Sequence, residues 1–405
     1  MRPADEQLEL LRRGIDAITP EAEFVKKLEH SARTGNPLRV KYGIDPTGID
    51  VHLGHTVPLR KLRQFQDLGH TAVIIIGDYT ALVGDPSGRS DHRAGLTKEQ
   101  VDANARDYLA QVGKIVDLSR AEVRRNGEWF GSWTFLDVLD LTRRMTIGQV
   151  SARDDFAQRI RGEKPVYLSE CLYPLMQGWD SVEIRADVEL GGTEQLFNLL
   201  VARDLQQEEG QLPQVAMTMP ILVGTDGTQR MGKSLGNYIG VAEPPETQFG
   251  KLMSIPDGPM RQYFTLLTDF PLAEVDALLG PGFNPRDAKE VLGKAVVSQY
   301  HGTEAAEAAA LAFRRRAAGE DPVEIPEAPL GRDQLDADGR IAPPKLLVAL
   351  KLESSTSNAR RVIEQGGVTI GPDRSPVTDP RGPIAVEDGL IVRVGKRKIA
   401  RVRLA

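Results

Sequence analysis

Two strand-like stretches, Arg39-Val-Lys-Tyr-Gly-Ile44 and Thr71-Ala-Val-Ile-Ile-Ile76, and the segment between them set the expected fold. From about Gly54 onward, apolar residues recur at helical spacing until Gly69, which is typical of a helix that ends at a glycine. Parallel strands buried on both faces are continuous aliphatic runs like the second stretch. Residues 39–77 therefore predict a strand–helix–strand unit.

A second unit of the same kind is expected further along the chain. Ala186-Asp-Val-Glu-Leu190 resembles a strand and leads to Gly191-Gly192 and a helix through Leu200. Residues 97–180, between the two units, have mostly helical patterns. The fold class is thus α/β, with an open, Rossmann-like parallel sheet that binds ligands at the carboxyl ends of its strands.

The rest of the chain divides into a helical part and a small terminal part. Residues 247–317 are rich in Ala and Leu and read as helices, whereas 320–330 are rich in Pro and acidic residues and read as a linker. The tail combines two helices with short strands. We expect a catalytic domain over 1–246, a helical domain and linker over 247–330, and a small α+β domain over 343–405.

Composition limits the class of protein. Of 405 residues, 40% are hydrophobic and 27% charged, as in ordinary globular proteins. No apolar run approaches the roughly 20 residues that span a bilayer, and the charged start lacks the apolar core of a signal peptide. Cys171 is the single cysteine and cannot form an internal disulfide. We expect a cytoplasmic protein without a membrane partner.

The net charge of −6 is unevenly distributed along the chain. Residues 343–405 contain 12 Lys and Arg against 6 Asp and Glu, so the tail carries +6 and the remainder −12. A basic end on an acidic body is expected when one end binds a polyanion, although a solvated charged surface gives the same pattern.

Two of the six histidines lie in His52-Leu53-Gly54-His55, where the first strand turns into its helix. A helix N-terminus exposes unpaired N–H groups and the positive end of the helix dipole, so it favours phosphate. The imidazoles can add donors, and Gly54 lets a nucleotide approach the backbone. In isolation, His52 would simply cap the helix and His55 would lie on the surface; the position after a strand favours phosphate binding.

The loop Gly227–Asn237 is a second candidate, because it holds Arg230 and Lys233 among glycines. Such a loop can close over a polyphosphate and open again after reaction. A flexible basic loop is more often a solvated connection. The loop alone therefore does not indicate phosphate binding, and this interpretation depends on the presence of the histidine segment.

Together the two segments resemble the HIGH and KMSKS signatures of class I aminoacyl-tRNA synthetases, here as His-Leu-Gly-His and Arg-Met-Gly-Lys-Ser. Four more motifs narrow the resemblance to bacterial tyrosyl-tRNA synthetases, in that family's order. They are Lys41–Thr47, Gly84–Arg89, Tyr173–Asp180 and Gly191–Gln195. The resemblance covers essentially the whole chain. It implies tRNA(Tyr), L-tyrosine and ATP as substrates, a KMSKS-like loop at 230–234, an anticodon-arm role for the helical domain, and homodimers through a helical insertion at about 105–180.

The resemblance places Asp180 on the phenol of tyrosine. Tyr173, Gln177 and Asp180 are spaced i, i+4 and i+7, so they share one face of a helix, where polar residues suggest a ligand wall instead of a core contact. Asp180 could otherwise be a solvent-facing carboxylate. Many relatives have a second phenol partner, a tyrosine, at the position of Lys41, and here the tyrosine is Tyr42. A lysine at that position can snorkel out of a pocket.

Further substrate contacts are implied by the same resemblance. Tyr173, Gln177 and Asp85 hold the ammonium of tyrosine, with Gln195 near its carboxylate. The residues expected at the nucleotide are Asp45, Thr47, Gly54, Gly192, Glu194, Met231 and Lys233. Many relatives have Asp in place of Glu194. Without the family pattern, single Asp and Thr residues in turns usually make local backbone bonds.

The implied reaction has two steps. The tyrosine carboxylate attacks the α-phosphorus of ATP and expels pyrophosphate, and the terminal adenosine of the tRNA then takes the aminoacyl group. Neither step needs a covalent enzymic nucleophile, which fits a sequence without a Ser–His–Asp or Cys–His signature. We expect catalysis by orientation and charge stabilisation, with Mg²⁺ on the polyphosphate and no metal site of the protein's own. The expected catalytic residues are His52, His55, Lys233, Arg230, Arg89 and Arg93.

The tail resembles the small RNA-binding module first described in ribosomal protein S-four. Basic residues on its surface would neutralise tRNA phosphates and give salt-sensitive affinity. The expected residues are Arg360, Arg361, Arg393, Lys396, Arg397 and Lys398. The turn 396–398, taken alone, is equally typical of an ordinary charged hairpin.

Three other interpretations remain open at this point. A tryptophan-specific relative has no phenol for Asp180 to bind, and a small nucleotidylyltransferase lacks the RNA-binding tail. A synthetase-derived RNA-binding or splicing factor would not need the histidine pair and Lys233. The sequence favours a tyrosine-specific synthetase over all three.

Overall fold

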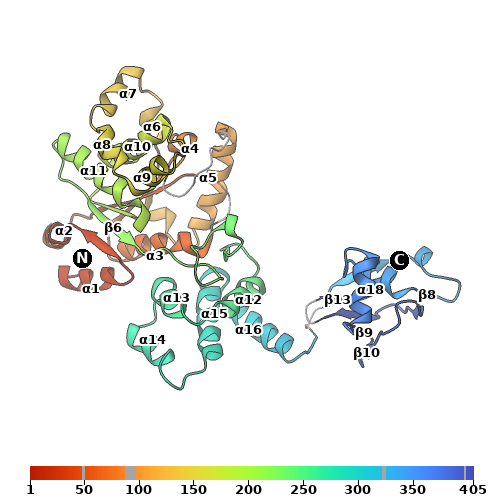
Figure 1. Ribbon diagram of the computed structural model, residues 1–405. Coiled ribbons are helices and arrows are strands. Elements are labelled where there is room, and N and C mark those ends of the chain that lie inside the picture. The colour runs from red at the N-terminus through yellow and green to blue at the C-terminus, as the bar shows by residue number, and fades with distance from the viewer. Residues whose placement is uncertain (48–50, 87–96, 322–324, 396–397) are drawn as a thin grey trace. The chain divides into compact units, whose positions relative to one another are not determined.

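A computed structural model describes residues 1–47, 51–86, 97–321, 325–395 and 398–405 (Figure 1). The chain forms two compact units, Met1–Ala306 and Glu307–Ala405. Each is described by itself below. None of the helices in these ranges combines the length and apolar character that a membrane span requires.

A six-stranded sheet forms the centre of the first unit. Its strands are parallel except for β1, which runs antiparallel to β6 at one edge. In spatial order they are β1 (Ala17–Thr19), β6 (Val215–Met219), β5 (Val188–Gly192), β2 (Arg39–Ile44), β3 (Thr71–Ile76) and β4 (Ala121–Arg125). The predicted strand–helix–strand unit is confirmed as β2, α3 (Leu53–Asp67) and β3. The second predicted unit is confirmed as β5 followed by α11 (Leu196–Glu208).

Strand β4 lies inside the segment that was expected to be mostly helical, so that expectation is wrong there. Its sequence, Ala-Glu-Val-Arg-Arg, has no aliphatic run, because β4 is an edge strand whose residues are only half-buried. The hydrophobic signal of a strand depends on burial of both faces. An edge strand of this kind gives little signal.

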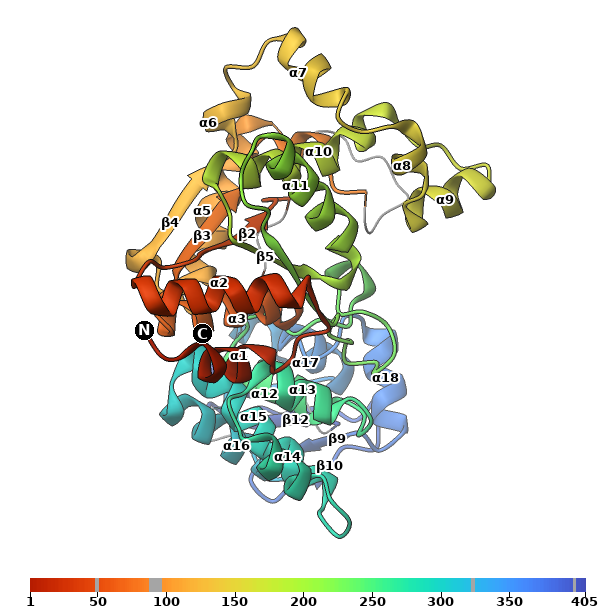
Figure 2. The same cartoon turned by 90° about the vertical axis from the view of Figure 1, so that its left-hand side faces the viewer.

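Helices cover both faces of the sheet. Helix α3 packs on β2, β3 and β5, while α11 packs on β5 and β6 and against α10 (Leu168–Ile184). Figures 1 and 2 show α10 and α11 on the side of the sheet opposite α3. The aliphatic strand residues Val40, Ile74 and Val188 are completely buried between these layers. Helix α2 (Glu21–Thr34) packs on β1 and β6, α1 (Ala4–Arg12) packs on α2 and α3, and α4 (Thr80–Val83) packs on α10; α5 (Lys98–Val112) precedes β4 in the chain.

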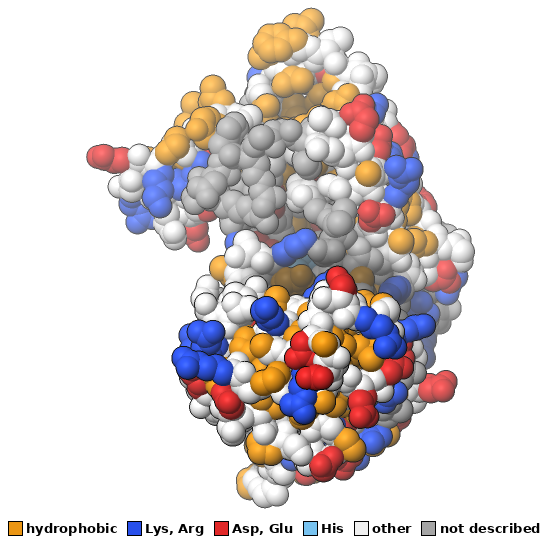
Figure 3. All heavy atoms as spheres, turned by 90° about the vertical axis from the view of Figure 1, so that its right-hand side faces the viewer, with side chains coloured by type: hydrophobic (Ala, Val, Ile, Leu, Met, Phe, Trp, Pro, Cys, Tyr) orange, Lys and Arg blue, Asp and Glu red, His pale blue; other side chains and the backbone are white. Residues whose placement is uncertain are grey.

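Short helices fill the insertion between β4 and β5. They are α6 (Gly127–Phe130), α7 (Phe135–Thr142), α8 (Ile147–Ser151) and α9 (Asp154–Arg161), followed by α10. Large apolar side chains of this region are exposed: Phe135 and Leu136 are each 74% exposed, Leu168 is 84% exposed and Ile147 is 85% exposed. Figure 3 shows hydrophobic side chains gathered at the top of the view, where α7 lies.

The helical pattern predicted for residues 247–317 is confirmed. Five helices follow the sheet: α12 (Pro245–Ser254), α13 (Met260–Leu267), α14 (Leu272–Leu278), α15 (Pro285–His301) and α16 (Thr303–Ala317). The first four belong to the first compact unit, where α13 packs on α3.

A five-stranded sheet and the helices α17 (Pro343–Ala349) and α18 (Thr356–Glu364) build the second unit, which also includes most of α16. The sheet order is β10 (Ser375–Pro376), β9 (Val368–Ile370), β12 (Ile391–Val394), β13 (Lys398–Leu404) and β7 (Glu327–Leu330), and β8 (Arg340–Ile341) pairs separately with β11 (Ile384–Ala385). Strand β7 lies in the segment expected to be a linker. It pairs in parallel with β13 and buries Leu330 in the core of this unit, so the folded part begins before residue 343.

Candidate active site

The histidine motif lies at the start of α3, the helix that follows β2 in the chain. His52 is the N-cap residue, and its ring stacks on that of His55 with the centroids 3.7 Å apart. Burial lowers the pKa of His52 to about 3, helped by His55, and lowers that of His55 to about 4. Both imidazoles are therefore neutral near pH 7. They can take part in hydrogen bonds without adding positive charge.

Backbone pairing brings the distant basic loop to this helix. Leu53 N donates to Ile239 O at 2.9 Å, and Val241 N donates to Val51 O at 2.8 Å. A Cβ atom built on Gly54 would lie 3.0 Å from the His52 ring and 3.6 Å from Met231 Cβ. The two segments that the sequence analysis singled out independently are thus adjacent in the fold.

Two residues that the sequence analysis missed, Asp226 and Asn237, organise the base of the loop. Asp226 Oδ1 accepts the N–H groups of Thr228 and Gln229, each at 2.8 Å, and its other oxygen accepts from the Asn237 amide. These bonds lower the pKa of Asp226 to about 2. Asn237 Oδ1 also accepts from Gly232 N at 2.8 Å. The signal that could have found them is the Asx-turn pattern Asp-Gly-Thr at residues 226–228.

The cations of the loop are exposed. Arg230 pairs in a β-bridge with Val223, and Lys233 begins a short 3-10 turn, Lys233–Leu235. Met231, in contrast, is buried and donates its N–H to Leu222 O at 2.8 Å. The loop is therefore anchored at Met231 with its charged side chains on the surface.

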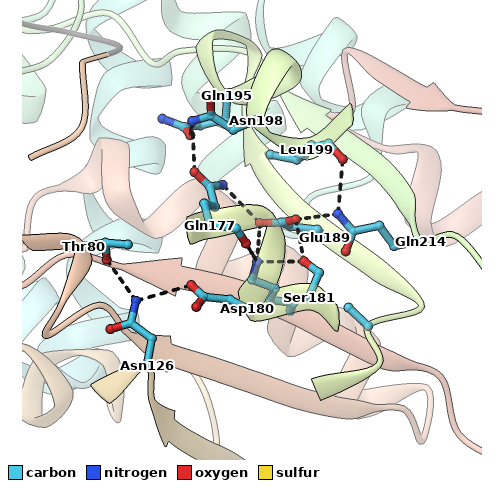
Figure 4. Close-up of polar contacts among 12 residues, drawn as sticks. Thr80, Asn126, Gln177, Asp180, Ser181, Glu189, Gln195, Asn198, Leu199 and Gln214 are labelled. Carbon is cyan, nitrogen blue, oxygen red and sulfur yellow. Dashed lines mark hydrogen bonds and ion pairs between the residues drawn. The ribbon is translucent and has the colours of Figure 1, made fainter. Parts of the chain in front are cut away.

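Asp180 lies on α10 and is buried, with 3% of its surface exposed. Its Oδ1 accepts from Trp129 Nε1 at 3.0 Å. Its Oδ2 accepts from Asn126 Nδ2 at 3.4 Å, the contact that Figure 4 shows. Burial raises the pKa of Asp180 to about 7, although the nearby charge of Lys41 and the two hydrogen bonds oppose the shift. The structure excludes a solvent-facing carboxylate at this position. Trp129 and Asn126, which orient it, carry no recognisable sequence signal.

Tyr173 and Asp45 contact each other directly, although the resemblance assigned them to different substrates. The Tyr173 hydroxyl donates to Asp45 Oδ2 at 2.7 Å, and Thr80 Oγ1 donates to Asp45 Oδ1 at 2.7 Å. Burial raises the pKa of Asp45 to about 7, and the two hydrogen bonds oppose this shift. The contact brings a residue expected at the amino acid next to one expected at the nucleotide.

A chain of amides connects the remaining residues expected at tyrosine. Asn198 Nδ2 donates to Gln177 Oε1 and to Gln195 Oε1, each at 2.9 Å. Gln195 Nε2 in turn donates to Asp85 Oδ2 at 2.7 Å. Figure 4 shows the Gln177, Asn198 and Gln195 side chains side by side. Asn198 was missed by the sequence analysis; it holds two of the predicted residues together.

The structure corrects the expectation for Lys41. Its side chain is completely buried and does not snorkel, because Glu189 accepts from Nζ at 2.9 Å. Successive side chains of a strand point to opposite faces, so Tyr42 lies on the other face of β2. Burial raises the pKa of Tyr42 far above its usual value, and the charge of Glu194 adds to the shift.

The turn after β5 holds two residues expected at the nucleotide. A Cβ atom on Gly192 would lie 2.2 Å from Glu194 Oε2, so the Glu194 carboxylate folds back over Gly192 and would have to move if this residue had a side chain. Burial raises the pKa of Glu194, while a backbone hydrogen bond and the charge of Arg230 oppose the shift. Thr47 is exposed beyond the end of β2, and its N–H donates to Asp45 O at 2.7 Å.

Two of the expected catalytic residues, Arg89 and Arg93, lie outside the described residues. Within the described ranges, no group of three or more His, Cys, Asp or Glu side chains is arranged to hold a metal ion.

The expected RNA-binding residues divide into three sets. Arg360 and Arg361 are exposed on α18, and Lys398 is exposed on β13, where its Nζ lies 2.7 Å from Glu353. Lys396 and Arg397 fall outside the described residues. Arg393 contradicts the expectation, because it is buried and forms an ion pair with Asp321. Val392 and Val394 belong to the hydrophobic core of this unit, so Arg393 between them points to the opposite face of β12, where Asp321 pairs with it.

The chain is similar to known proteins over nearly all of its length. The family model for class I tRNA synthetases of the W and Y type matches residues 33–317. The tyrosine–tRNA ligase of Symbiobacterium thermophilum is 48% identical over 99% of this chain and 98% of its own length. That of Moorella thermoacetica is also 48% identical, over 98% of this chain and 95% of its own length.

Solved structures give the same result. The tyrosyl-tRNA synthetase of Archaeoglobus fulgidus, determined with L-tyrosine, is 26% identical, with a TM-score of 0.61 over 76% of this chain and 99% of that one. A C-terminally truncated mitochondrial tyrosyl-tRNA synthetase from Aspergillus nidulans, 22% identical with a TM-score of 0.61 over 78% of this chain and 94% of that one, shares the fold.

Proposed function

Since this chain belongs to the tyrosine–tRNA ligases, which are class I aminoacyl-tRNA synthetases, we propose that it activates L-tyrosine with ATP and transfers it to the 3′ end of tRNA(Tyr). The tyrosine carboxylate attacks the α-phosphorus and releases pyrophosphate. A hydroxyl of the terminal adenosine then attacks the carbonyl carbon of the adenylate and releases AMP. The observation that carries the proposal is the buried, oriented carboxylate of Asp180.

Asp180 reads the phenol of the substrate. A buried polar group that loses its partner costs free energy, so a site that pairs with a phenol rejects phenylalanine; tyrosyl-tRNA synthetases are themselves the standard case of this principle. Trp129 and Asn126 occupy one position on each carboxylate oxygen and leave further lone pairs for the substrate hydroxyl. Tryptophan has no hydroxyl to pair with this group.

The ammonium and carboxylate end of the substrate tyrosine is held by Tyr173 and by the residues that the amide chain connects. Tyr173, Gln177 and Asp85 bind the ammonium, and Gln195 lies near the carboxylate. The Tyr173–Asp45 and Gln195–Asp85 hydrogen bonds support this assignment, because they join these residues into one polar wall. The contact of Tyr173 with Asp45 supports an orientation in which the ammonium end of tyrosine lies toward the nucleotide, where the carboxylate must react.

The nucleotide lies at the α3 N-terminus. Gly54 allows close approach, His52 and His55 act as neutral hydrogen-bonding groups for phosphate, and Glu194 contacts the ribose. Asp45, Thr47, Gly192 and Met231 complete the contacts to the nucleotide. Lys233, Arg230, Arg89 and Arg93 neutralise the charge that develops on the pentavalent phosphorus and pyrophosphate.

Magnesium enters with the substrate. The described residues offer no cluster of carboxylates for a resident metal, whereas Mg²⁺ is commonly held by substrate phosphates with few protein ligands. When bound, it neutralises polyphosphate charge. The protein's own part is to orient the reacting carboxylate and phosphate.

The second unit binds tRNA. The exposed Arg360 and Arg361 on one face of α18, together with Lys398, support a contact with the phosphate backbone. The turn residues Lys396 and Arg397 belong to the same proposed surface. The helices of residues 247–330 then serve the anticodon arm, and the substrates tRNA and ATP imply a cytoplasmic location.

A second copy of the chain covers the apolar insertion. Exposed side chains on α7, α8 and α10, each at least 74% exposed, form the surface expected of a dimer interface. They are Phe135, Leu136, Ile147 and Leu168. Analytical ultracentrifugation tests this: a single species at 44.4 kDa, the mass of one chain, contradicts it.

Pyrophosphate exchange with each of the twenty amino acids tests the activity. We expect exchange with tyrosine alone. Asp180→Asn should lower kcat/KM for tyrosine about 100-fold, because a charged hydrogen bond to a buried group is lost. Asp204→Asn, which changes an exposed carboxylate on α11, is the matched control. Pyrophosphate exchange with tryptophan would support a tryptophan-specific relative. No exchange with any amino acid, together with RNA binding, would support a synthetase-derived RNA-binding or splicing factor.

A further inference from the structure

A buried ion pair lies directly behind the proposed tyrosine site. Lys41 on β2 and Glu189 on β5 are register partners on neighbouring strands, with 2.9 Å between Nζ and Oε1. Their side chains are 0% and 1% exposed. Burying two charges is costly, and such a pair is often no more stabilising than apolar residues of the same size. Its presence therefore calls for a role other than stability.

Lys41 cannot act on a ligand itself. Besides Glu189, its Nζ donates to Gln177 O at 2.7 Å and to Ser181 Oγ at 2.8 Å. An ammonium group has three protons, and each of them has an acceptor here. Through its contacts the ion pair reaches Gln177, and its two charges act on the pKa of Asp180 in opposite directions, Lys41 lowering it and Glu189 raising it.

Glu189 controls the orientation of the Gln177 amide. Its Oε1 accepts from Gln177 Nε2 at 3.1 Å, and its Oε2 accepts from Ser181 Oγ at 3.1 Å and from Gln214 Nε2. A carboxylate can only accept, so Gln177 must turn its NH₂ group toward Glu189 and its oxygen away. Figure 4 shows Gln177 between Glu189 on one side and Asn198 on the other.

The opposite end of the amide is fixed by a second charge. Asn198 Nδ2 donates to Gln177 Oε1 at 2.9 Å, and Asn198 Oδ1 accepts from Arg153 at 2.8 Å. Arg153 is itself buried. A guanidinium can only donate, so Asn198 cannot flip. An anion on one side and a cation on the other thus set the direction of both amides.

We propose that the Lys41–Glu189 pair is a positioning element that keeps the Gln177 oxygen toward the substrate ammonium and so selects ligands that carry a free α-ammonium. This rests on the proposed function, in which Gln177 binds that group. An ammonium only donates, and the Gln177 oxygen keeps a second lone pair to accept from it. With the amide reversed, two N–H donors would face the positive charge.

The experiment compares two ligands that differ only in the ammonium. L-Tyrosine and 3-(4-hydroxyphenyl)propanoate are titrated by calorimetry into the full-length protein and its Glu189→Gln variant. We expect Glu189→Gln to weaken tyrosine binding about tenfold, the value of one hydrogen bond to a charged group, and to change binding of the deaminated ligand less than about twofold. A neutral amide at position 189 removes the anionic one of the two constraints on the Gln177 orientation and leaves only the hydrogen bond from Asn198.

Gln214→Met is the matched control. Gln214 is equally buried and donates to the same carboxylate, but it does not contact Gln177. It should leave the ratio of the two affinities unchanged. If Glu189→Gln does not fold, the variant Lys41→Met/Glu189→Gln, which removes both charges, should show the same change in ratio. When Gln177 is already replaced by Met, adding Glu189→Gln should not change the ratio of the affinities for tyrosine and the deaminated ligand any further.

Equal weakening of both ligands, or an equal change of ratio in Gln214→Met, would show that the pair is merely structural. Either result overturns this inference and leaves the proposed function intact. A wild-type protein that exchanges no pyrophosphate with tyrosine would instead contradict the proposed function.

Discussion

At the scale of single residues, the site is dominated by carboxylates taken out of water. Asp180 and Asp45 are held by neutral donors, Trp129 and Asn126 for the first, Tyr173 and Thr80 for the second. Burial raises the pKa of each to about 7. Such groups oppose folding when ionised and are retained because a ligand needs them.

The pH dependence of stability follows from Asp180. Its carboxyl keeps a proton in the folded chain up to about pH 7 but loses it near pH 4 when unfolded, so its ionisation lowers stability as the pH rises through this window. Asp180→Asn removes the effect. We compare the Tm of the variant with that of the wild type, both without ligand. The Tm of the variant minus that of the wild type should be about 2–4 °C larger at pH 8 than at pH 5. Scanning calorimetry measures this, and a difference that stays constant or falls would contradict it.

At the scale of elements, the backbone pairing of residues 51–53 with 239–241 joins the N-terminus of α3 to the basic loop. Asp226 and Asn237 then hold the loop base while Lys233 stays exposed. An anchored base with an exposed charged part is the arrangement expected of a loop that closes on phosphates during reaction.

Lys233→Ala tests the role of this loop. If Lys233 acts mainly in the transition state, kcat for pyrophosphate exchange should fall about 100-fold while the Kd for tyrosine stays within about twofold. Gln229→Ala, an exposed change in the same loop, should do neither. Unchanged adenylate formation in Lys233→Ala would rule out the transition-state role.

Two arginine sets in the second unit should behave differently. Arg360→Ala/Arg361→Ala removes two exposed charges, so the KM for tRNA should rise and the slope of log affinity against log salt should fall by about 2, with Tm unchanged. Arg393→Ala breaks the ion pair with Asp321. Because the Arg393 side chain is 7% exposed and that of Asp321 27%, the loss of this pair should lower the Tm of the second unit. If Arg393→Ala is fully folded but its tRNA affinity depends less steeply on salt than that of the wild type, Arg393 contacts tRNA and the structural role assigned to it is wrong.

At the scale of the whole molecule, the chain consists of two compact units. Strand β7 and Asp321 belong structurally with the tail, through β13 and Arg393 respectively. A separation of activities therefore requires a cut before residue 321 and after the end of α16.

A chain that ends at residue 320 should retain tyrosine-dependent pyrophosphate exchange within about twofold, because every residue placed at tyrosine or ATP precedes the cut. Charging of tRNA should fall by at least about tenfold, because the phosphate contacts are lost. Filter assays of both reactions on the same preparation measure the difference. Equal loss of both activities would contradict this division.

The sequence by itself determined the α/β fold, both strand–helix units and the family, because aliphatic runs and motif spacing are local properties of the chain. It also predicted, from three polar residues on one helix face, that Asp180 does not face solvent, and the burial of Asp180 confirms this. The strands that it missed include β4 and β7, which have weak hydrophobic patterns at sheet edges, and also the buried β6.

Only the tertiary structure decided which charged side chains are exposed to a ligand and which are buried in ion pairs. The sequence cannot distinguish Arg393 from Arg360, or show that Lys41 is sealed against Glu189, because burial and pairing depend on residues far away in the chain. The same holds for Trp129, Asn126 and Asn198, ordinary side chains that act through the partners the fold brings to them.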